Sequence, residues 1–269
     1  MIRLVVTDLD GTFWLPDLTV PPAHLAAVTA LTDRGVEVMV ATSRRQRVVA
    51  EHLGRVGLAP AAVVLDGAMG VDLRDGTRFH EATFPIRAAE DVLAQFRSAG
   101  IEPCVYVDEG EVDVVLPPVP STSPAYLAYI APVARTGDLD AVVARRGVFG
   151  FSVMGLSHAE ASPLADALTA FGAELMLLHE ERYDGWSLIV APPGVTKWNG
   201  VMTYAERRGI DSDEILAVGD GDNDVDLLTR AGTAVAVRGG AERALAVADH
   251  VVDAPESNGW SSVIDLAGG

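Results

Sequence analysis

Residues 1–12 read Met1-Ile2-Arg3-Leu4-Val5-Val6-Thr7-Asp8-Leu9-Asp10-Gly11-Thr12. The run from Ile2 to Val6 is apolar, rich in β-branched residues and too short for a helix, so it predicts a buried central strand of a parallel sheet. Asp8 and Asp10 follow it, and where the strand ends both carboxylates can turn toward the crevice in which open α/β sheets bind ligands. Two carboxylates this close repel each other unless a cation lies between them or one takes a proton. The stretch is therefore either a chemical site or an Asp-rich turn that caps the next element.

Composition limits the classes of function. The chain has 269 residues and is 49% hydrophobic, which is enough for a large core and for two domains. A net charge of −18 argues against nucleic acid and anionic membranes as partners, so an anionic substrate has to be attracted locally, by a metal and a few cations. Cys104 is the only cysteine, which excludes an intrachain disulfide. Because no signal-peptide pattern and no long apolar run is present, we expect a cytoplasmic protein without a membrane anchor.

Two parts of the chain, residues 1–82 and 191–269, alternate strand and helix patterns. Such alternation predicts an α/β core with a doubly wound, mostly parallel sheet and right-handed crossovers. The turn at Asp75-Gly76 predicts a hairpin within the first part. The expected strands are 2–6, 36–41, 62–65, 215–218, 233–237 and 250–252, and the expected helices are 22–34, 44–54, 196–208, 223–230 and 241–248.

The segment between them, residues 83–190, has a different pattern. Neighbouring strands are joined by short turns, which predicts an antiparallel sheet with helices on one face, inserted as a second domain. A proline-rich run, residues 117–124, can only be an irregular loop. We expect strands at 101–107, 112–116, 148–154, 174–179 and 186–190, with helices at 86–99 and 159–171 and a helical stretch between the loop and residue 146.

A second acidic stretch, Gly219-Asp220-Gly221-Asp222-Asn223-Asp224-Val225-Asp226, follows another buried strand. Its oxygen ligands suit a hard cation such as Mg²⁺ or Ca²⁺. An EF-hand loop starting at Asp220 fails, because Val225 and Ala231 stand where glycine and glutamate belong. A dinucleotide-binding loop fails because Asp224 replaces the third glycine. A solvated acidic turn stays as the simple alternative.

Positive charge that could face a phosphate lies at Lys197, at the start of a helix whose amide dipoles also favour anions. Thr42 ends the second strand with a hydroxyl group. Taken singly, the two residues are better explained as a surface lysine and a helix cap, so their significance depends on their order along the chain.

That order, Asp8-Leu9-Asp10-Gly11-Thr12, then Thr42, Lys197 and finally residues 219–224, resembles the haloacid dehalogenase (HAD) superfamily of phosphohydrolases. The resemblance covers essentially the whole chain, and the long insertion between the second and third motifs is similar to the C2B cap of the Cof-type subfamily. It implies a HAD-like Rossmannoid core, residues 1–82 and 191–269, and an α/β cap, residues 83–190, that selects the substrate.

The resemblance implies a role for each motif residue. Asp8 would be the nucleophile that forms an aspartyl-phosphate, and Asp10 the acid and base. Mg²⁺ would be bound by Asp8, Asp220 and the backbone carbonyl of Asp10, with Asp224 supporting the site, so we expect residues 8 and 220 to lie close enough to share one ion. The residues that would hold the phosphoryl group are Thr42, Lys197 and Asn223.

Some positions depart from the family pattern. Ser43 replaces a usual glycine, Asp66 stands where asparagine is common, and Trp198 follows Lys197 in place of glycine. These changes affect the rim of the pocket. Side chains of the inserted segment that could reach a substrate, or equally form its core or surface, are Tyr106, Tyr126, Tyr129, Arg182, Tyr183 and Trp186. We interpret His158 and His179 as structural.

The sequence thus favours a Mg²⁺-dependent phosphatase, a monomer or homodimer, that acts on a small phosphorylated metabolite such as a sugar phosphate or a phosphorylated cofactor. A phosphomutase of the phosphomannomutase type is an alternative, which release of free phosphate would exclude. A response-regulator receiver would be much shorter and needs no acid two residues after the phosphorylated one. A binding protein that has lost turnover is the third alternative.

Overall fold

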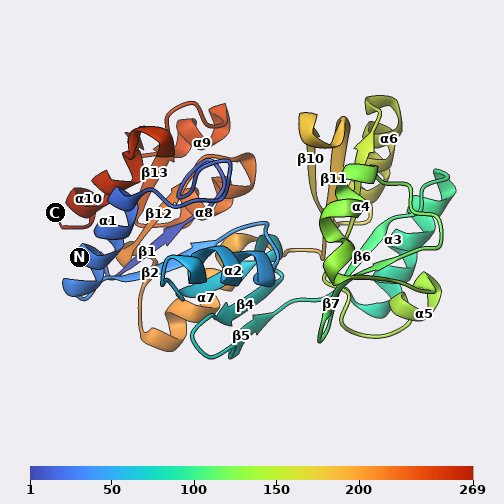
Figure 1. Ribbon diagram of the computed structural model, residues 1–269, viewed down its shortest axis with the longest axis horizontal. Coiled ribbons are helices and arrows are strands. Elements are labelled where there is room, and N and C mark those ends of the chain that lie inside the picture. The colour runs from blue at the N-terminus through green and yellow to red at the C-terminus, as the bar shows by residue number, and fades with distance from the viewer. Residues whose placement is uncertain (269) are drawn as a thin grey trace. The chain divides into compact units, whose positions relative to one another are not determined.

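The computed structural model describes residues 1–268, which form two compact units (Figure 1). One comprises Met1–Glu81 with Thr196–Gly269, and the other comprises Ala82–Val195. The second boundary lies a few residues later than the expected 190/191. The last strand of the inserted unit runs to Ala191, and Gly194 N then donates a hydrogen bond to Glu174 Oε1 at 3.2 Å, so the turn at 192–195 stays with that unit.

The first unit is built on an eight-stranded sheet with the order β14-β13-β12-β1-β2-β3-β4-β5. All neighbours are parallel except β3–β4 and β4–β5, which are antiparallel. The expected doubly wound, mostly parallel sheet is therefore confirmed. Its strands are β1 (Leu4–Thr7), β2 (Glu37–Ala41), β3 (Ala61–Val64), β4 (Met69–Asp72), β5 (Arg78–Glu81), β12 (Ile215–Gly219), β13 (Thr233–Val237) and β14 (His250–Val252).

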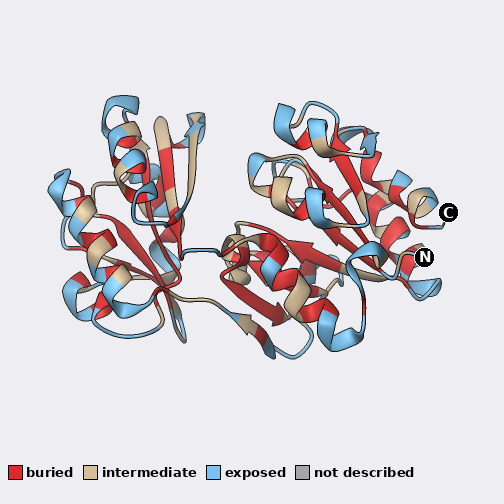
Figure 2. Ribbon diagram, turned by 180° about the vertical axis from the view of Figure 1, so that it is seen from behind, coloured by how far each residue is buried: buried red, intermediate tan, exposed pale blue. Residues whose placement is uncertain are grey.

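Helices cover both faces of this sheet. The core on one face joins Leu4 and Val6 of β1 to helices α7, α8 and α9. Side chains alternate along a strand, so Val5 and Thr7 point to the other face, where α1 contacts β2 and α10. The strands are mainly buried and the helices are exposed on their outer sides (Figure 2). The helices are α1 (Pro22–Asp33), α2 (Gln46–Arg55), α7 (Lys197–Arg208), α8 (Val225–Arg230), α9 (Glu242–Val247) and α10 (Val263–Ala267).

The inserted unit has a six-stranded sheet with the order β10-β11-β9-β6-β7-β8. Its pairs are antiparallel except β7–β8, which is parallel. Buried side chains of α3, α5 and α6 form one core with alternate residues of the central strands, such as Val105, Phe151 and Leu188. The elements are α3 (Ile86–Ser98), β6 (Cys104–Glu109), β7 (Val112–Leu116), α4 (Pro124–Ile130), β8 (Ala134–Thr136), α5 (Leu139–Val143), β9 (Gly150–Leu156), α6 (His158–Thr169), β10 (Glu174–Glu180) and β11 (Gly185–Ala191).

The expected helical stretch up to residue 146 is wrong in its middle. The structure has α4, then the short strand β8, then α5. Pro132 cannot donate the next helical hydrogen bond, and Asp138 starts α5 by accepting a bond from Asp140 N at 3.0 Å. The three residues between these signals pair with β7 instead. Among residues 1–268, none of the helices combines the length and apolar character that crossing a membrane requires.

Candidate active site

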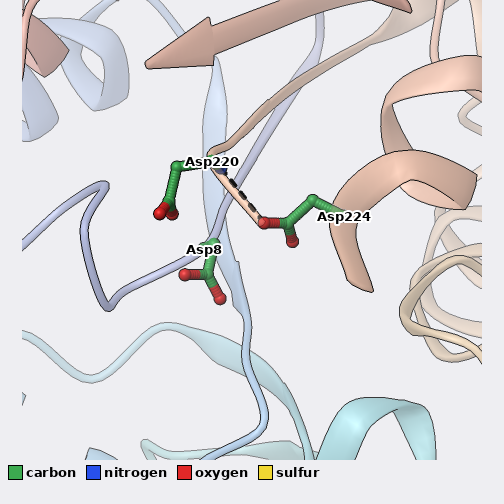
Figure 3. Close-up of side chains that lie close together, drawn as sticks. All are labelled: Asp8, Asp220 and Asp224. Atoms are coloured by element: carbon green, nitrogen blue, oxygen red, sulfur yellow. Dashed lines mark hydrogen bonds between the residues drawn. The ribbon is translucent and has the colours of Figure 1, made fainter. Parts of the chain in front are cut away.

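Three carboxylates meet at the carboxyl end of the first sheet (Figure 3). β1 and β12 are parallel neighbours with Thr7 opposite Val218, so the residues that follow the two strands emerge side by side. Asp8 N donates to Val218 O at 2.9 Å, which holds Asp8 beside β12. Asp8, Asp220 and Asp224 each offer an oxygen that lies within 4.8 Å of the other two. The two distant acidic segments therefore form one cluster.

The loop after β12 is shaped by its own side chains. Asp224 Oδ2 accepts hydrogen bonds from the backbone N of Asp220 at 3.1 Å and of Gly221 at 3.0 Å. Thr12, which follows the first acidic motif, donates its hydroxyl to Asp220 Oδ1 at 2.7 Å. Both interactions fix the carboxylates before any ligand binds, which is what a preorganised site requires.

Lys197 places a positive charge in the cluster. It is the first residue of α7 and its side chain is 1% exposed. Nζ donates to Asp8 Oδ1 at 2.7 Å and to Asp224 Oδ1 at 2.6 Å. Burial disfavours the charged ammonium, but the carboxylates of Asp224, Asp8 and Asp66 outweigh it, and the pKa of Lys197 is raised. The charged ammonium form of Lys197 is therefore favoured.

The cluster contains three carboxyl groups and one ammonium group, so its acidic groups outnumber its basic group. Burial raises the pKa of Asp8 well above its ordinary value, and the carboxylates of Asp224 and Asp220 add to this while Lys197 acts against it. Burial also raises the pKa of Asp220, against the hydrogen bond from Thr12. Carboxylates with raised pKa values around one crevice are what a bound cation would relieve.

The oxygen set fits a small hard cation. Mg²⁺ binds oxygen at about 2.1 Å in octahedral geometry, so ligand oxygens on opposite sides of the ion lie about 4.2 Å apart. The three carboxylates already place one oxygen each within 4.8 Å of the other two, which is close to that spacing. They contain no nitrogen or sulfur ligand, which favours Mg²⁺ over zinc.

The Asp10 carboxylate is held apart from this cluster by Arg44. Arg44 Nε donates to Asp10 Oδ2 at 2.8 Å and Nη2 donates to Oδ1 at 2.6 Å, a two-point pairing. Trp14 Nε1 donates to the same Oδ1 at 3.1 Å. The side chain of Asp10 is 41% exposed, so this carboxylate lies at the open edge of the site.

A short turn links the other motif residues. Asp66, in the 3-10 turn Leu65–Gly67, donates its backbone N to Thr42 O at 3.1 Å and accepts a hydrogen bond from Asn223 Nδ2 at 2.9 Å. Leu65 and Asp66 both have φ +53°, the left-handed region that residues other than glycine rarely adopt. Burial raises the pKa of Asp66, while Lys197 and the Asn223 amide act against it. Strain of this kind is tolerated where the surroundings fix the backbone.

Gly67 is the point where this turn touches the start of α7. Its φ is +112°, and a Cβ there would lie 2.2 Å from Thr196 O. We expect Gly67→Ala to lower the free energy of unfolding by about 1–3 kcal/mol and to lower kcat by displacing Lys197. Gly76→Ala is the control, because Gly76 has φ +76° and open space around it. Equal losses of stability and activity in the two variants, measured by urea unfolding and turnover, would contradict the contact.

Comparison with known proteins gives the family. A family of haloacid dehalogenase-like hydrolases matches residues 5–264. The chain belongs to this family. The pyridoxal phosphate phosphatase YbhA of Escherichia coli is 23% identical over 268 residues, 93% of this chain and 92% of that protein. The HMP-PP phosphatase of Serratia proteamaculans is 27% identical over 240 residues, 87% of this chain and 83% of that protein.

Solved structures show the same fold. A HAD phosphatase from Bacteroides thetaiotaomicron superposes with a TM-score of 0.83 at 22% identity, covering 100% of this chain and 96% of that one. A HAD subclass IIB sugar phosphatase superposes with a TM-score of 0.78 at 19% identity, covering 99% of each chain. Two further relatives match over only part of their length. The chain covers 13% of a chloroplastic endoribonuclease from Arabidopsis thaliana and 30% of a Methanopyrus kandleri phosphoglycolate phosphatase.

The HAD-like chain thus has most of the expected site residues in two groups. Asp8, Asp220, Asp224 and Lys197 form one cluster, and Thr42 and Asn223 are joined through Asp66. The Asp10 side chain is paired with Arg44 instead. Sequence reasoning assigned no individual role to Arg44 or Thr12, although Thr12 ends the first motif and Arg44 lies two residues after Thr42.

Several side chains proposed for substrate contact in the inserted unit pack against one another. The hydroxyl groups of Tyr106 and Tyr126 lie 2.6 Å apart, and the ring of Tyr126 meets that of Tyr183 edge to face at 5.4 Å. All three are at most 9% exposed. Trp186 lies between two imidazole rings, 4.7 Å from that of His158 and 5.7 Å from that of His179. The guanidinium of Arg182 stacks on the ring of Tyr129 at 5.1 Å.

Proposed function

We propose that this HAD-like hydrolase is a Mg²⁺-dependent phosphatase that hydrolyses a phosphate monoester of a small metabolite through an aspartyl-phosphate. The observation that carries the proposal is the buried cluster in which Asp8 shares one crevice with Lys197 and two further carboxylates. The family assignment and the phosphatase names of full-length relatives confirm the expected enzyme class, a phosphoric monoester hydrolase.

Asp8, Asp220 and the backbone carbonyl of Asp10 would hold the metal, with Asp224 positioned by its two backbone hydrogen bonds to support them. Bound Mg²⁺ supplies positive charge that lets an anionic nucleophile approach an anionic phosphate. Side chains of the protein carry out nucleophilic attack and proton transfer.

In the first step, an Asp8 carboxylate oxygen attacks phosphorus and forms an acyl phosphate while the bond from phosphorus to the ester oxygen breaks. Asp10 donates a proton to that leaving oxygen. The lysine ammonium, already within hydrogen-bond distance of Asp8, neutralises the oxygens of the transferring group. Thr42 and Asn223 complete the phosphoryl pocket in this proposal.

In the second step, water attacks phosphorus and Asp10 takes its proton. The bond from phosphorus to the Asp8 oxygen breaks, which releases inorganic phosphate and restores the carboxylate. Arg44 and Trp14 together donate three hydrogen bonds to Asp10, so both proton transfers take place at a carboxyl group whose orientation these two side chains fix. Its exposure at the edge of the site lets the substrate oxygen and the water reach it.

The substrate class follows from the relatives. One full-length relative is named for pyridoxal phosphate and another for HMP-PP, and both are small phosphorylated compounds. We include sugar phosphates because the motif order and the inserted segment are similar to those of Cof-type phosphatases. The role of residues 83–190 as a substrate-selecting cap, the cytoplasmic location and a monomeric or homodimeric state are parts of the same proposal.

The test is hydrolysis of p-nitrophenyl phosphate, pyridoxal 5′-phosphate and a panel of sugar phosphates, followed by release of free phosphate. We expect turnover with Mg²⁺, a loss of about 100-fold or more in EDTA, and recovery when Mg²⁺ is restored, because the buried carboxylates repel the substrate without the ion. An isomerised sugar phosphate in place of free phosphate would indicate a phosphomutase. Absence of turnover over the whole panel would refute a phosphatase and favour a binding protein.

A further inference from the structure

Trp260 is linked through Thr7 to the backbone of Asp8, the proposed nucleophile. Trp260 lies in the 3-10 segment Gly259–Ser262, and its side chain is 1% exposed. Its indole Nε1 donates to Thr7 Oγ1 at 2.9 Å, and Thr7 Oγ1 donates to the backbone carbonyl of Asp8 at 2.7 Å. Trp260 and Asp8 are therefore the two ends of a short buried hydrogen-bond chain.

The chemistry of the three groups fixes which of them donates and which accepts each hydrogen bond. An indole N–H can only donate and a backbone carbonyl can only accept, so the single hydroxyl proton of Thr7 has to point at Asp8 O. A hydroxyl that accepts one bond while donating another is polarised, and each bond strengthens the other. The side chain of Thr7 is fully buried, so water does not compete for either bond.

This hydrogen-bond chain lies at the last residue of β1, where the regular pairing of the sheet ends. β1 ends at Thr7, and the Asp8 N donates to Val218 O at 2.9 Å. The hydroxyl of Thr7 holds the opposite side of the same residue, its carbonyl. Together the two bonds define the orientation of the backbone from which the Asp8 carboxylate projects.

The Trp260 ring also supports the turn that follows. It meets the ring of Phe13 edge to face at 4.8 Å, and Phe13 N donates to Leu9 O at 2.9 Å. His24 Nδ1 lies 2.8 Å from Phe13 O and its ring is 5.9 Å from that of Trp260. One buried aromatic group thus contacts both ends of the loop that carries Asp8 and Asp10.

We propose that Trp260 is a positioning residue for the nucleophile, acting through the Thr7 hydroxyl to hold the Asp8 backbone in the orientation that in-line attack requires. The proposal rests on the phosphatase function above. Trp260 touches no reacting atom, so its loss should affect the rate of attack and not the affinity for substrate. A misplacement of about 1 Å at a nucleophile can cost about 100-fold in rate.

The experiment compares Trp260→Phe, Thr7→Val, the double variant and Thr7→Ser, with turnover of p-nitrophenyl phosphate in Mg²⁺. Trp260→Phe keeps a ring and removes the N–H, Thr7→Val removes the hydroxyl, and Thr7→Ser keeps it. We expect about a 10- to 100-fold loss of kcat in each of the first two, with KM changed less than about 2-fold. The double variant should be no slower than the slower single variant, because both substitutions break one chain. Thr7→Ser should stay near the wild-type rate.

Phe79→Leu, which changes a buried ring of β5 at the edge of the same sheet as Thr7, controls for a general loss of stability and should leave kcat unchanged. A folded Trp260→Phe with wild-type kcat, losses that multiply in the double variant, or a raised KM at constant kcat would each overturn the proposal. If Trp260→Phe does not fold, the contrast between Thr7→Val and Thr7→Ser decides the question. Failure of the phosphatase proposal is distinct, since the wild type itself would then release no phosphate.

Discussion

Asp8→Asn should lower kcat by about 10⁴-fold or more while the protein stays folded. The asparagine amide is not nucleophilic toward phosphorus, and it also withdraws one charged ligand from the metal. Stability should not fall, because burial already raises the pKa of Asp8 and the neutral amide does not incur the cost of a buried charge. The amide oxygen can still accept the hydrogen bond from Lys197 Nζ.

The measurement is turnover of p-nitrophenyl phosphate together with thermal unfolding. Asp222→Asn is the matched control, since Asp222 lies in the same acidic loop with a side chain 64% exposed, and we expect less than about a 2-fold change in its kcat. Rapid acid quench should trap phosphate on the wild type and none on Asp8→Asn. An Asp8→Asn variant that turns over at the wild-type rate would remove the nucleophile assignment.

The fold was largely predictable because its signals are local. Apolar runs ending in glycine or acidic residues marked the strands of the first sheet, and parallel order followed from the intervening helices. β8 was missed because Ala134–Thr136 carries no strand pattern of its own, and it pairs with β7 only because Pro132 ends the preceding helical turn. A three-residue segment carries too little local pattern to predict a strand that forms only through pairing with a neighbour.

The candidate site was predictable for a different reason. Carboxyl ends of parallel strands meet at one edge of a sheet, so Asp8 and Asp220 could be expected together from their places after β1 and β12. The pairing of Asp10 with Arg44, and that of Asp66 with Asn223, could not be foreseen, since each depends on a side-chain direction set by a loop. The bond from Trp260 to Thr7 spans almost the whole chain and has no local signal.

Lys197→Met should reduce both activity and stability. The substitution keeps the unbranched side chain up to the position of Cε but leaves Asp8 and Asp224 without their shared ammonium. Breaking a buried pair by removing one partner costs about 3–5 kcal/mol, because the remaining charges stay buried and unpaired. The transferring phosphoryl group also loses a positive charge in a buried site, so we expect kcat to fall about 10³-fold.

The stability loss should depend on pH. A carboxyl whose folded-state pKa is raised keeps its proton in the folded protein at pH values where the unfolded chain has released it. Stability from this source is complete below the unfolded pKa of about 3.9 and is lost as the pH rises through the folded pKa. The pKa of Asp8 is already raised in the wild type, and removal of Lys197 raises it further. Metal-free Lys197→Met should therefore be less destabilised, relative to the wild type, at pH 5 than at pH 8.

Urea unfolding in EDTA at the two pH values measures this difference, and Mg²⁺ should restore part of the lost stability by replacing the missing positive charge. Arg55→Met is the matched control, since Arg55 pairs with Glu51 on α2 and both side chains are at least 60% exposed. Exposed pairs of this type contribute about 0.3–0.5 kcal/mol, with no comparable pH dependence. If Lys197→Met were no less stable than Arg55→Met, the lysine would not compensate the buried carboxylates, and its place in the phosphoryl pocket would lose its physical basis.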